Sequence, residues 1–143
     1  MTDDGLRGVA YHEAGHAVVT LALDLRVARV EIFHENNSGE TDAENADHLP
    51  LEDRIAICVA GIQANKMFKV PIHGRAAFLD RYSVRELISY MAKTEGDVLC
   101  DKGHQHARDL LKAYAHSVHD IAERLLTYRK IDLTGYVLPV TAR

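Results

Sequence analysis

The sequence predicts a mainly helical domain with a small β element, which places it in the α+β fold class. The chain has 143 residues, the usual size of one domain, and 47% of them are apolar, enough to bury a core. Most apolar residues recur three and four positions apart, as on a helix, and one short stretch alternates as a strand does. There is no internal repeat and no linker, so we expect a single domain over residues 1–143.

The N-terminal part of the chain predicts one helix followed by one strand. Residues 4–24 should form the helix, because their apolar side chains recur at helical spacing. Residues 27–34, "VARVEIFH", should form the strand, because Ala28, Val30 and Ile32 alternate with charged residues. We therefore expect a half-buried strand directly after the first helix.

A loop and a second helix should follow. Residues 34–50 are acidic and rich in Asn, so we expect a loop there, with a tight turn at Ser38 and Gly39. Pro50 then precedes residues 51–69, which are apolar at helical spacing. Together these signals place the second helix at 51–69.

The C-terminal half predicts two further helices. The first covers 78–94, and a connection around 96–103 leads to a last long helix that ends near Tyr128. Residues 132–139 should dock on the core as a terminal segment. The inward side chains expected for the helix at 78–94 are Val84, Leu87, Ile88 and Met91.

Composition and charge exclude several classes of function. The net charge is -4 and there is no run of Lys or Arg, so neither nucleic acid nor a membrane surface is an expected partner. The longest apolar run, residues 17–25, is too short for a membrane span, and residues 1–10 are too acidic for a signal peptide. Cys58 and Cys100 lie far apart and indicate free thiols, so we expect a cytoplasmic protein.

One short motif in the first helix carries recognisable chemistry. His12 and His16 lie one helical turn apart on the same face, so both imidazoles can reach one Zn²⁺. Glu13 lies beside them and can take a proton from a water molecule that zinc has acidified. This is the logic of the H-E-x-x-H motif of metallopeptidases. Gly15, inside the motif, indicates that another segment approaches closely there.

The simpler interpretation of the motif is a helix that carries two surface histidines by chance. The neighbouring residues, Ala10, Ala14, Ala17 and Val18, argue against this, because they predict a buried face. Polar groups on such a face are costly without partners. We therefore favour metal binding.

The third ligand lies elsewhere in the sequence. A catalytic zinc site usually has three protein ligands. A metzincin would supply the third from position 22, with Gly at position 19, but this chain has Val19 and Ala22, so that class is excluded.

Asp80 is the best candidate for the third ligand. It lies four residues before Val84 and seven before Leu87, on the inward face of the helix at 78–94. A carboxylate on such a face needs a partner, and a cation is a suitable one. The alternative is that Asp80 caps that helix. His104 is the reserve ligand, and Glu86 falls off the inward face and should be solvated.

At this point the chain resembles the peptidase domain of the FtsH-type ATP-dependent zinc metalloproteases. The likeness is strongest in "YHEAGHAVV" and continues through "VARVEIF", "LEDRIAICVAGIQANKMF" and "AAFLDRYSVRELISYMA" to the last helix. The resemblance implies that His12, His16 and Asp80 bind zinc and that Glu13 is the general base. It also implies a mostly helical fold with a small β element, and a hexamer held partly by an ATPase domain.

The sequence also departs from that family. It contains no Walker motif and no transmembrane segment, and "AGIQAN" replaces the family's glycine pair and acidic residue. We therefore expect a stand-alone zinc endopeptidase that cleaves unfolded or flexible protein segments without ATP. The same resemblance implies that the chain forms a homo-oligomer or works with a separate ATPase as its partner.

Two details of substrate binding follow from the predicted elements. The edge of the strand at 27–33 should hold an extended peptide by main-chain hydrogen bonds. The acidic loop at 35–53 is either a lid over the cleft or a solvated surface loop.

Two alternatives to an endopeptidase stay open. The chain could be a binding or structural module whose zinc stabilises the fold, or a subunit that depends on a partner. It could also hydrolyse a non-peptide amide with the same zinc chemistry.

Overall fold

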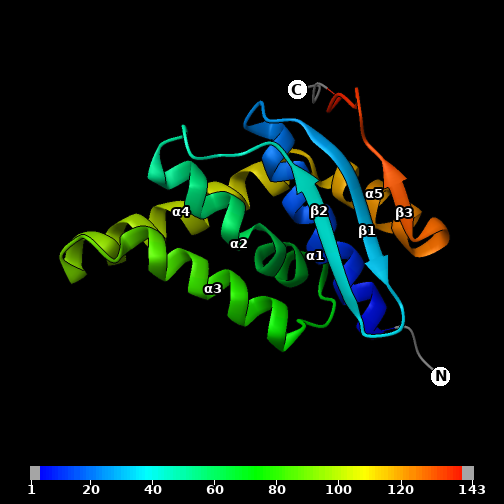
Figure 1. Ribbon diagram of the computed structural model, residues 1–143, viewed down its shortest axis with the longest axis horizontal. Coiled ribbons are helices and arrows are strands. Elements are labelled where there is room, and N and C mark those ends of the chain that lie inside the picture. Colours follow the sequence, from blue (N-terminus) through cyan, green and yellow to red (C-terminus); the bar gives the residue numbers. More distant parts are fainter. Residues whose placement is uncertain (1–3, 140–143) are drawn as a thin grey trace.

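The computed structural model describes residues 4–139, which form a helical body with a three-stranded antiparallel sheet on one side (Figure 1). This confirms the predicted α+β class. The elements, in chain order, are α1 (Asp4–Ala22), β1 (Val27–Phe33), β2 (Ser38–Ala43), α2 (Leu51–Phe68), α3 (Gly74–Ile88), α4 (Lys93–Ala113), α5 (Ala115–Tyr128) and β3 (Lys130–Asp132).

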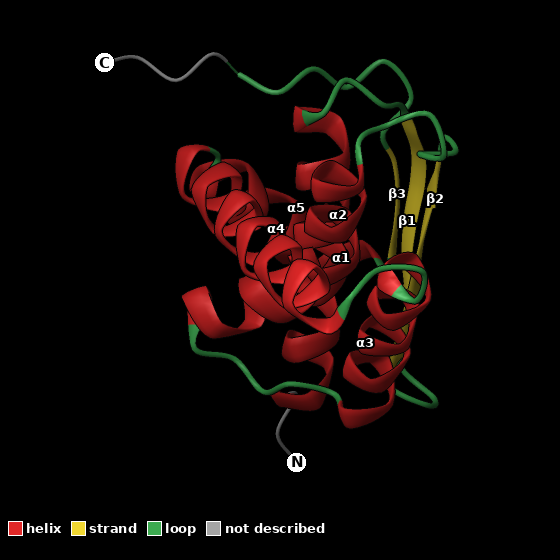
Figure 2. Ribbon diagram, turned by 90° about the vertical axis from the view of Figure 1, so that its left-hand side faces the viewer, coloured by secondary structure: helices red, strands yellow, loops and turns green. Residues whose placement is uncertain are grey.

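Helix α1 lies at the centre of the molecule. The sheet covers one side of it, and α2 and α5 pack on other sides (Figure 2). Most of its residues are buried, and its side chains form the largest part of the hydrophobic core. The helix predicted at 4–24 is thus confirmed to within two residues, and the motif that it carries lies deep in the fold.

Helices α1 and α2 approach each other closely at Gly15. A Cβ atom at this position would lie 2.6 Å from the Cβ of Ala64 and 2.8 Å from the carbonyl oxygen of Ala60. Real Cβ atoms do not come this close to backbone, so only glycine fits. The close approach expected from the sequence at Gly15 is confirmed.

A polar cluster joins α1 to α5 on the other side. The Tyr11 hydroxyl donates to Glu123 Oε2 at 2.7 Å and lies 2.9 Å from Nδ1 of His119, and Arg7 pairs with the same carboxylate. Burial, together with the hydrogen bond that the Tyr11 hydroxyl donates to Glu123, raises the pKa of Tyr11 to about 12. The cluster fixes the helical turn that comes directly before His12.

The β region differs from the sequence prediction in two respects. Residues 38–43, expected to lie in a loop, form β2, and the turn falls at 34–37, where Asn37 has a φ of +49°. The strand was missed because "SGETDA" has no apolar alternation: main-chain pairing with β1 holds it at an exposed edge. Ala28, expected to point inward, is exposed, because the pairing register shifts between Val27 and Arg29.

The helices of the C-terminal half also have different boundaries from those predicted. The helix expected at 78–94 begins at Gly74 and ends at Ile88, and Met91 lies in the bend after it. The connection expected at 96–103 is part of α4. Its glycines do not break the helix, because they allow close packing: Gly96 lies against Ile88, and Gly103 against Ile55 of α2.

The last helix is divided, and a short strand follows it. The chain bends at Tyr114, which has a φ of -117°, so α4 and α5 take the place of the one long helix predicted to end near Tyr128. Residues 130–132 form β3 on the free side of β1, and Leu133 is buried next to it, so the terminal segment docks on the core as expected. Cys58 and Cys100 are free and half-buried. Within residues 4–139, no helix combines the length and the apolar character that a membrane crossing requires.

We predict that Gly15→Ala destabilises the fold although alanine favours a helix. The added methyl group collides with α2, and overpacking of this kind costs about 1–3 kcal/mol. Gly74→Ala is the matched control, because a Cβ at that position meets no atom within 4 Å. Urea unfolding of both variants measures the difference. Equal stabilities would contradict the close approach of α1 and α2.

Candidate metal centre

The structure brings His12, His16 and Asp80 together at one point. Helix α1 supplies the two histidines from the same face, and α3 supplies Asp80 from across the cleft. The Nε2 atoms of the two imidazoles are 3.1 Å apart. Oδ2 of Asp80 lies 2.9 Å from Nε2 of His12 and 3.2 Å from Nε2 of His16. Within the described chain this is the one group of three His, Cys, Asp or Glu side chains close enough to share an ion.

Hydrogen bonds on the far sides of both rings set their orientation. Nδ1 of His16 donates to the carbonyl oxygen of Ile57 at 2.8 Å. Nδ1 of His12 lies 3.3 Å from Oδ1 of Asn65, whose amide nitrogen donates to the carbonyl oxygen of Gly8. An acceptor faces each Nδ1 atom, so this network assigns the proton of each neutral ring to Nδ1. The two Nε2 lone pairs are therefore directed toward Asp80.

This donor set fits a small divalent cation. Two neutral imidazoles and a carboxylate present three acceptor atoms to one another, with no hydrogen between them. Three acceptors at such short distances repel unless a cation lies among them. Tetrahedral ligands about 2.0–2.1 Å from one zinc ion lie roughly 3.3 Å apart, close to the separations found here. Nitrogen and oxygen ligands of this kind suit Zn²⁺.

Without a metal, a proton takes the place of the cation. Burial by itself lowers the pKa of His16, but the hydrogen bond and the charge of Asp80 outweigh it and raise the pKa to about 9. Burial raises the pKa of Asp80, and the hydrogen bonds to His12 and His16 outweigh that effect and lower it to about 2. A metal ion must therefore displace a proton from His16 when it binds.

Two residues of α2 shape the rear of the group. A Cβ at Gly61 would lie 2.5 Å from three atoms of the His12 ring, so the imidazole packs directly on the helix backbone. Burial, with the nearby charge of Asp80, raises the pKa of Cys58 to about 11. Cys58 is therefore a neutral thiol at pH 7 in the metal-free chain, and it lies outside the group of three.

Glu13 is held beside the histidines by β2. Its side chain is buried, and Oε1 accepts a hydrogen bond of 2.7 Å from the hydroxyl of Thr41. A Cβ at Gly39 would lie 2.7 Å from Cγ of Glu13, so only glycine allows the strand to pass this close. The negative charge of Glu13 also acts on His16 and favours its protonated form.

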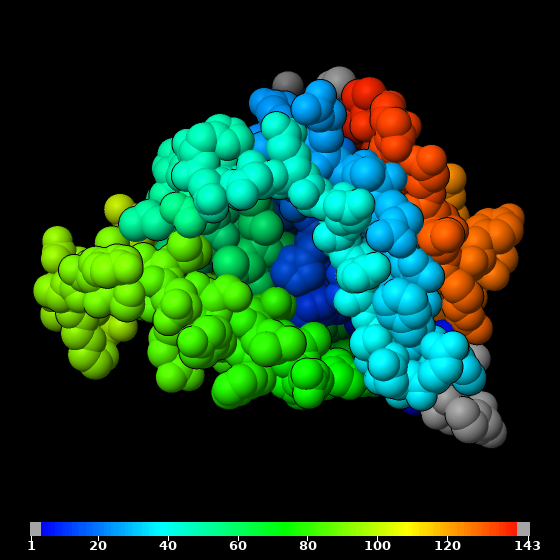
Figure 3. All heavy atoms as spheres, in the orientation of Figure 1, coloured from blue at the N-terminus to red at the C-terminus, as the bar shows by residue number. Residues whose placement is uncertain are grey.

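A cleft leads from the surface to this point. The surface is hollowed between β2 and α3, and α1 is visible at the bottom of the hollow (Figure 3). A cavity of about 110 Å³ lies there, with His12 and Glu13 in its wall. Leu79 and Arg75 of α3 line the opposite side. A small side chain or a short stretch of main chain can enter it.

The other candidate residues lie apart from the group. His104, the reserve ligand, lies 2.8 Å from the amide nitrogen of Gln63 and outside the group of three. Asp80 does not cap α3, since His73 is the N-cap and its Nδ1 accepts from the backbone N–H of Ala76. Glu86 is exposed, as expected.

Two predictions about substrate binding were wrong in detail. The strand β1 is the central strand, in the order β2-β1-β3, so both of its edges are already paired. Within the described residues the edge next to the cleft belongs to β2. The acidic loop expected at 35–53 does not exist as one loop, because β2 occupies its centre and α2 begins at Leu51.

Sequence reasoning missed the residues that hold the side chains of the motif in place. Asn65 and Thr41 each bond to a motif residue, but nothing in their local sequence distinguishes them. Gly61 and Gly39 carried a signal, because a glycine inside a helix or strand indicates a close approach. That signal does not say which side chain approaches.

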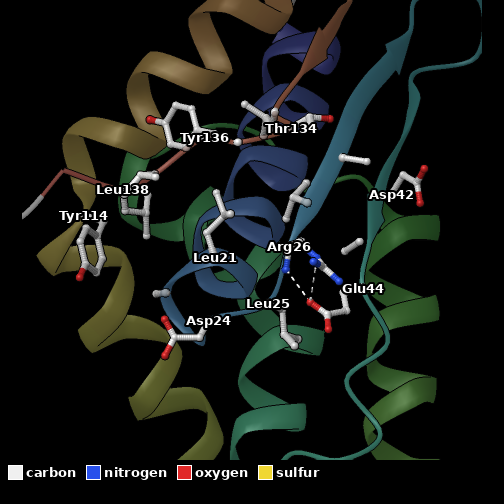
Figure 4. Close-up of a pocket in the computed structure, with 17 residues that line it drawn as sticks. Leu21, Asp24, Leu25, Arg26, Asp42, Glu44, Tyr114, Thr134, Tyr136 and Leu138 are labelled. Carbon is white, nitrogen blue, oxygen red and sulfur yellow. Dashed lines mark hydrogen bonds and ion pairs between the residues drawn. The ribbon is translucent and has the colours of Figure 1, made fainter.

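A second, larger cavity lies away from the group of His12, His16 and Asp80. Its volume is about 710 Å³, and the end of α1, the end of β2 and residues 133–138 line it. Leu21, Leu25 and Tyr136 lie around it, and Arg26 pairs with Glu44 at its edge (Figure 4). None of the predicted site residues is among its lining residues, and the group of His12, His16 and Asp80 lies outside it.

Comparison with known proteins supports a distant FtsH-like relationship. No model of a known protein family matches the chain. The ATP-dependent zinc metalloprotease FtsH 2 of Sphaerobacter thermophilus is 28% identical over 88% of this chain. The matched region is 25% of that protein, so the chain spans about a quarter of the length of the curated relative.

We predict that the metal-stripped chain is most stable between about pH 4 and 6.5. The pKa of His16, about 9 in the folded chain against 6.5, gives stability that is complete below pH 6.5 and lost toward pH 9. The pKa of Asp80, about 2 against 3.8, gives stability that is present above pH 3.8 and lost toward pH 2. Melting temperatures across this range, with chelator present, test the prediction. If Asp80→Asn melted with the same pH profile as wild type, the pairing would be refuted.

We predict that Asn65→Ala weakens zinc binding although Asn65 is not a ligand. The substitution removes the acceptor of His12 Nδ1, and loss of such a partner typically costs about 10- to 100-fold in metal affinity. Gln63→Ala is the matched control, since Gln63 is a buried amide on the same helix that bonds to His104 instead. Competition with a zinc-binding dye measures both affinities, and equal losses would exclude the orienting role.

Proposed function

We propose that this chain is a zinc-dependent endopeptidase that cleaves unfolded or flexible protein segments and needs no ATP for the cleavage itself. One observation carries the proposal: three acceptor atoms of His12, His16 and Asp80 converge beside a buried glutamate, at the bottom of a cleft. The similarity to a zinc metalloprotease supports the same conclusion.

In this proposal His12, His16 and Asp80 hold the zinc ion. When bound, zinc supplies a Lewis acid that polarises a peptide carbonyl and lowers the pKa of water to about 7. The protein keeps the two imidazole nitrogens in place before the metal arrives, because Asn65 and the carbonyl of Ile57 orient the rings.

Glu13 is the proposed general base. Its carboxylate takes the proton of the attacking water and then delivers that proton to the nitrogen of the leaving amine. The hydroxyl of Thr41 holds Oε1 at 2.7 Å, so the carboxylate keeps one orientation. A purely structural zinc site has no use for a carboxylate held in this way, which favours an enzyme over a structural module.

The edge of β2 is the proposed site of substrate binding. It is an edge strand within the described chain and borders the cleft, so an extended peptide can pair with its main chain. Only exposed or flexible segments can adopt this form. The proposal includes one domain over residues 1–143 and a cytoplasmic location. A homo-oligomer or a separate ATPase that delivers folded substrates is compatible with it.

We predict that Glu13→Gln abolishes cleavage and keeps the metal. Loss of a general base lowers the rate about 10²- to 10⁴-fold, whereas the amide leaves the three ligands untouched. The assay follows an unfolded, fluorescently labelled protein, and zinc content is measured on the same samples. Glu95→Gln, an exposed residue in the first turn of α4, is the matched control and should cleave as wild type does.

The outcomes separate the proposal from its alternatives. Full activity in Glu13→Gln would refute the assignment of the base. No cleavage by any variant, with zinc bound and a large loss of melting temperature on chelation, would reject the endopeptidase and favour a zinc-stabilised module. Cleavage of small amides without cleavage of protein would assign a non-peptide substrate.

A further inference from the structure

Helix α3 presents an unusual outer face. Its inner side holds Asp80 and the only two buried residues of the helix, Ala77 and Val84. Its outer side is apolar where a surface helix is normally polar. Of the eight large hydrophobic side chains exposed in the described residues, four lie in the segment 72–82, namely Ile72, Phe78, Leu79 and Tyr82.

The arginines of α3 are also unlike the others. Ten arginines lie in the described part of the chain. Seven of them make a hydrogen bond or an ion pair through their side chains: Arg7, Arg26, Arg29, Arg54, Arg108, Arg124 and Arg129. The other three, Arg75, Arg81 and Arg85, are exposed on α3 and make none within residues 4–139.

Five of these residues form one stripe, which we call the α3 docking face: Arg75, Phe78, Leu79, Tyr82 and Arg85. They follow one another at helical spacing, so they share one side of the helix. The stripe is apolar in the middle and has an arginine at each end. Glu86 lies at its C-terminal end and is the one acidic side chain on this side of α3.

The α3 docking face continues into the cleft. Arg75 and Leu79 line the cavity whose wall also contains His12 and Glu13. In the space-filling view, α3 forms one wall of the hollow, and the wall opposite is β2 (Figure 3). A polypeptide paired with the edge of β2 would therefore turn its other side toward α3.

We infer that the α3 docking face binds the polypeptide substrate and selects acidic segments with apolar side chains at their centre. The inference rests on the proposed function, since it names the substrate class of that site. Apolar side chains of the substrate would cover Phe78, Leu79 and Tyr82, and carboxylates would pair with the two free guanidinium groups. A second copy of this chain is the competing occupant.

The length of the α3 docking face sets the expected spacing of the acidic residues in a bound substrate. Arg75 and Arg85 are ten residues apart, which corresponds to about 15 Å along a helix. An extended peptide covers that length in about four or five residues. The preferred segment therefore has two acidic residues four or five positions apart, with apolar residues between them.

We predict that charge reversal on this face reverses peptide preference. The probes are two fluorescein-labelled peptides with the cores Asp-Leu-Phe-Leu-Asp and Lys-Leu-Phe-Leu-Lys. They are titrated by anisotropy against the zinc-loaded Glu13→Gln variant, which binds without cleaving. We expect the Asp peptide to bind about fivefold more tightly at low salt, with the difference lost at high salt.

Matched variants locate the effect. Adding Arg75→Glu and Arg85→Glu to the Glu13→Gln variant should abolish or invert the preference for the Asp peptide. The control adds Arg108→Glu and Arg124→Glu, on α4 and α5, instead. It changes the net charge by the same amount and should preserve the preference. Glu86→Gln should strengthen binding of the Asp peptide. Melting curves confirm that each variant is folded.

Three outcomes would overturn the inference. They are equal affinity for the two peptides, equal effects of the two double charge reversals, and a dimer in sedimentation that only the α3 reversal dissociates. The last would assign the face to a second copy of the chain. Binding is measured on a variant designed not to cleave, so the test of binding is separate from the test of cleavage. The peptide preference can be absent while the chain cleaves protein, and it can be present while the chain does not.

Discussion

The burial of α1 on nearly all sides is the constraint on which the rest of the structure depends. A helix in this position cannot carry His12 and Glu13 unless each polar atom finds a partner. Every buried side-chain nitrogen and oxygen in the described residues has one. The partners of the motif side chains come from α2, α3 and β2, so the elements packed around the motif also orient it. The contacts that pack α1 into the core are therefore also the contacts that orient the candidate site residues.

Glycine makes this enclosure possible at three points around α1. Gly15 admits the backbone of α2, Gly61 admits the ring of His12, and Gly39 admits the side chain of Glu13. At each point a single methyl group would push an element away by a few tenths of an ångström or more. Glycine usually weakens a helix or a strand. Here the cost in local propensity is offset by distances that place polar groups within hydrogen-bonding range.

Much of this arrangement could be predicted from local patterns. The helical spacing around His12 located α1, and the inward face that includes Val84 pointed to Asp80 as the residue that meets the histidines. The features that were not predicted correctly are those that depend on contacts with distant parts of the chain. The strand β2 is held by pairing with β1 and not by its own composition, and Gly103 lies inside a helix because it packs against Ile55. Partners such as Asn65 belong to distant elements and need the fold to be known.

The two halves of the candidate metal-binding group differ in how firmly they are anchored. The histidines belong to a helix enclosed by core, whereas Asp80 belongs to α3, which buries only Ala77 and Val84 and packs mainly on α2. Helices with so few buried contacts open locally at a small fraction of the cost of global unfolding. Asp80 can therefore move away while the two histidines stay aligned. A metal ion held at this point would therefore exchange through the local opening of α3, without disruption of the core.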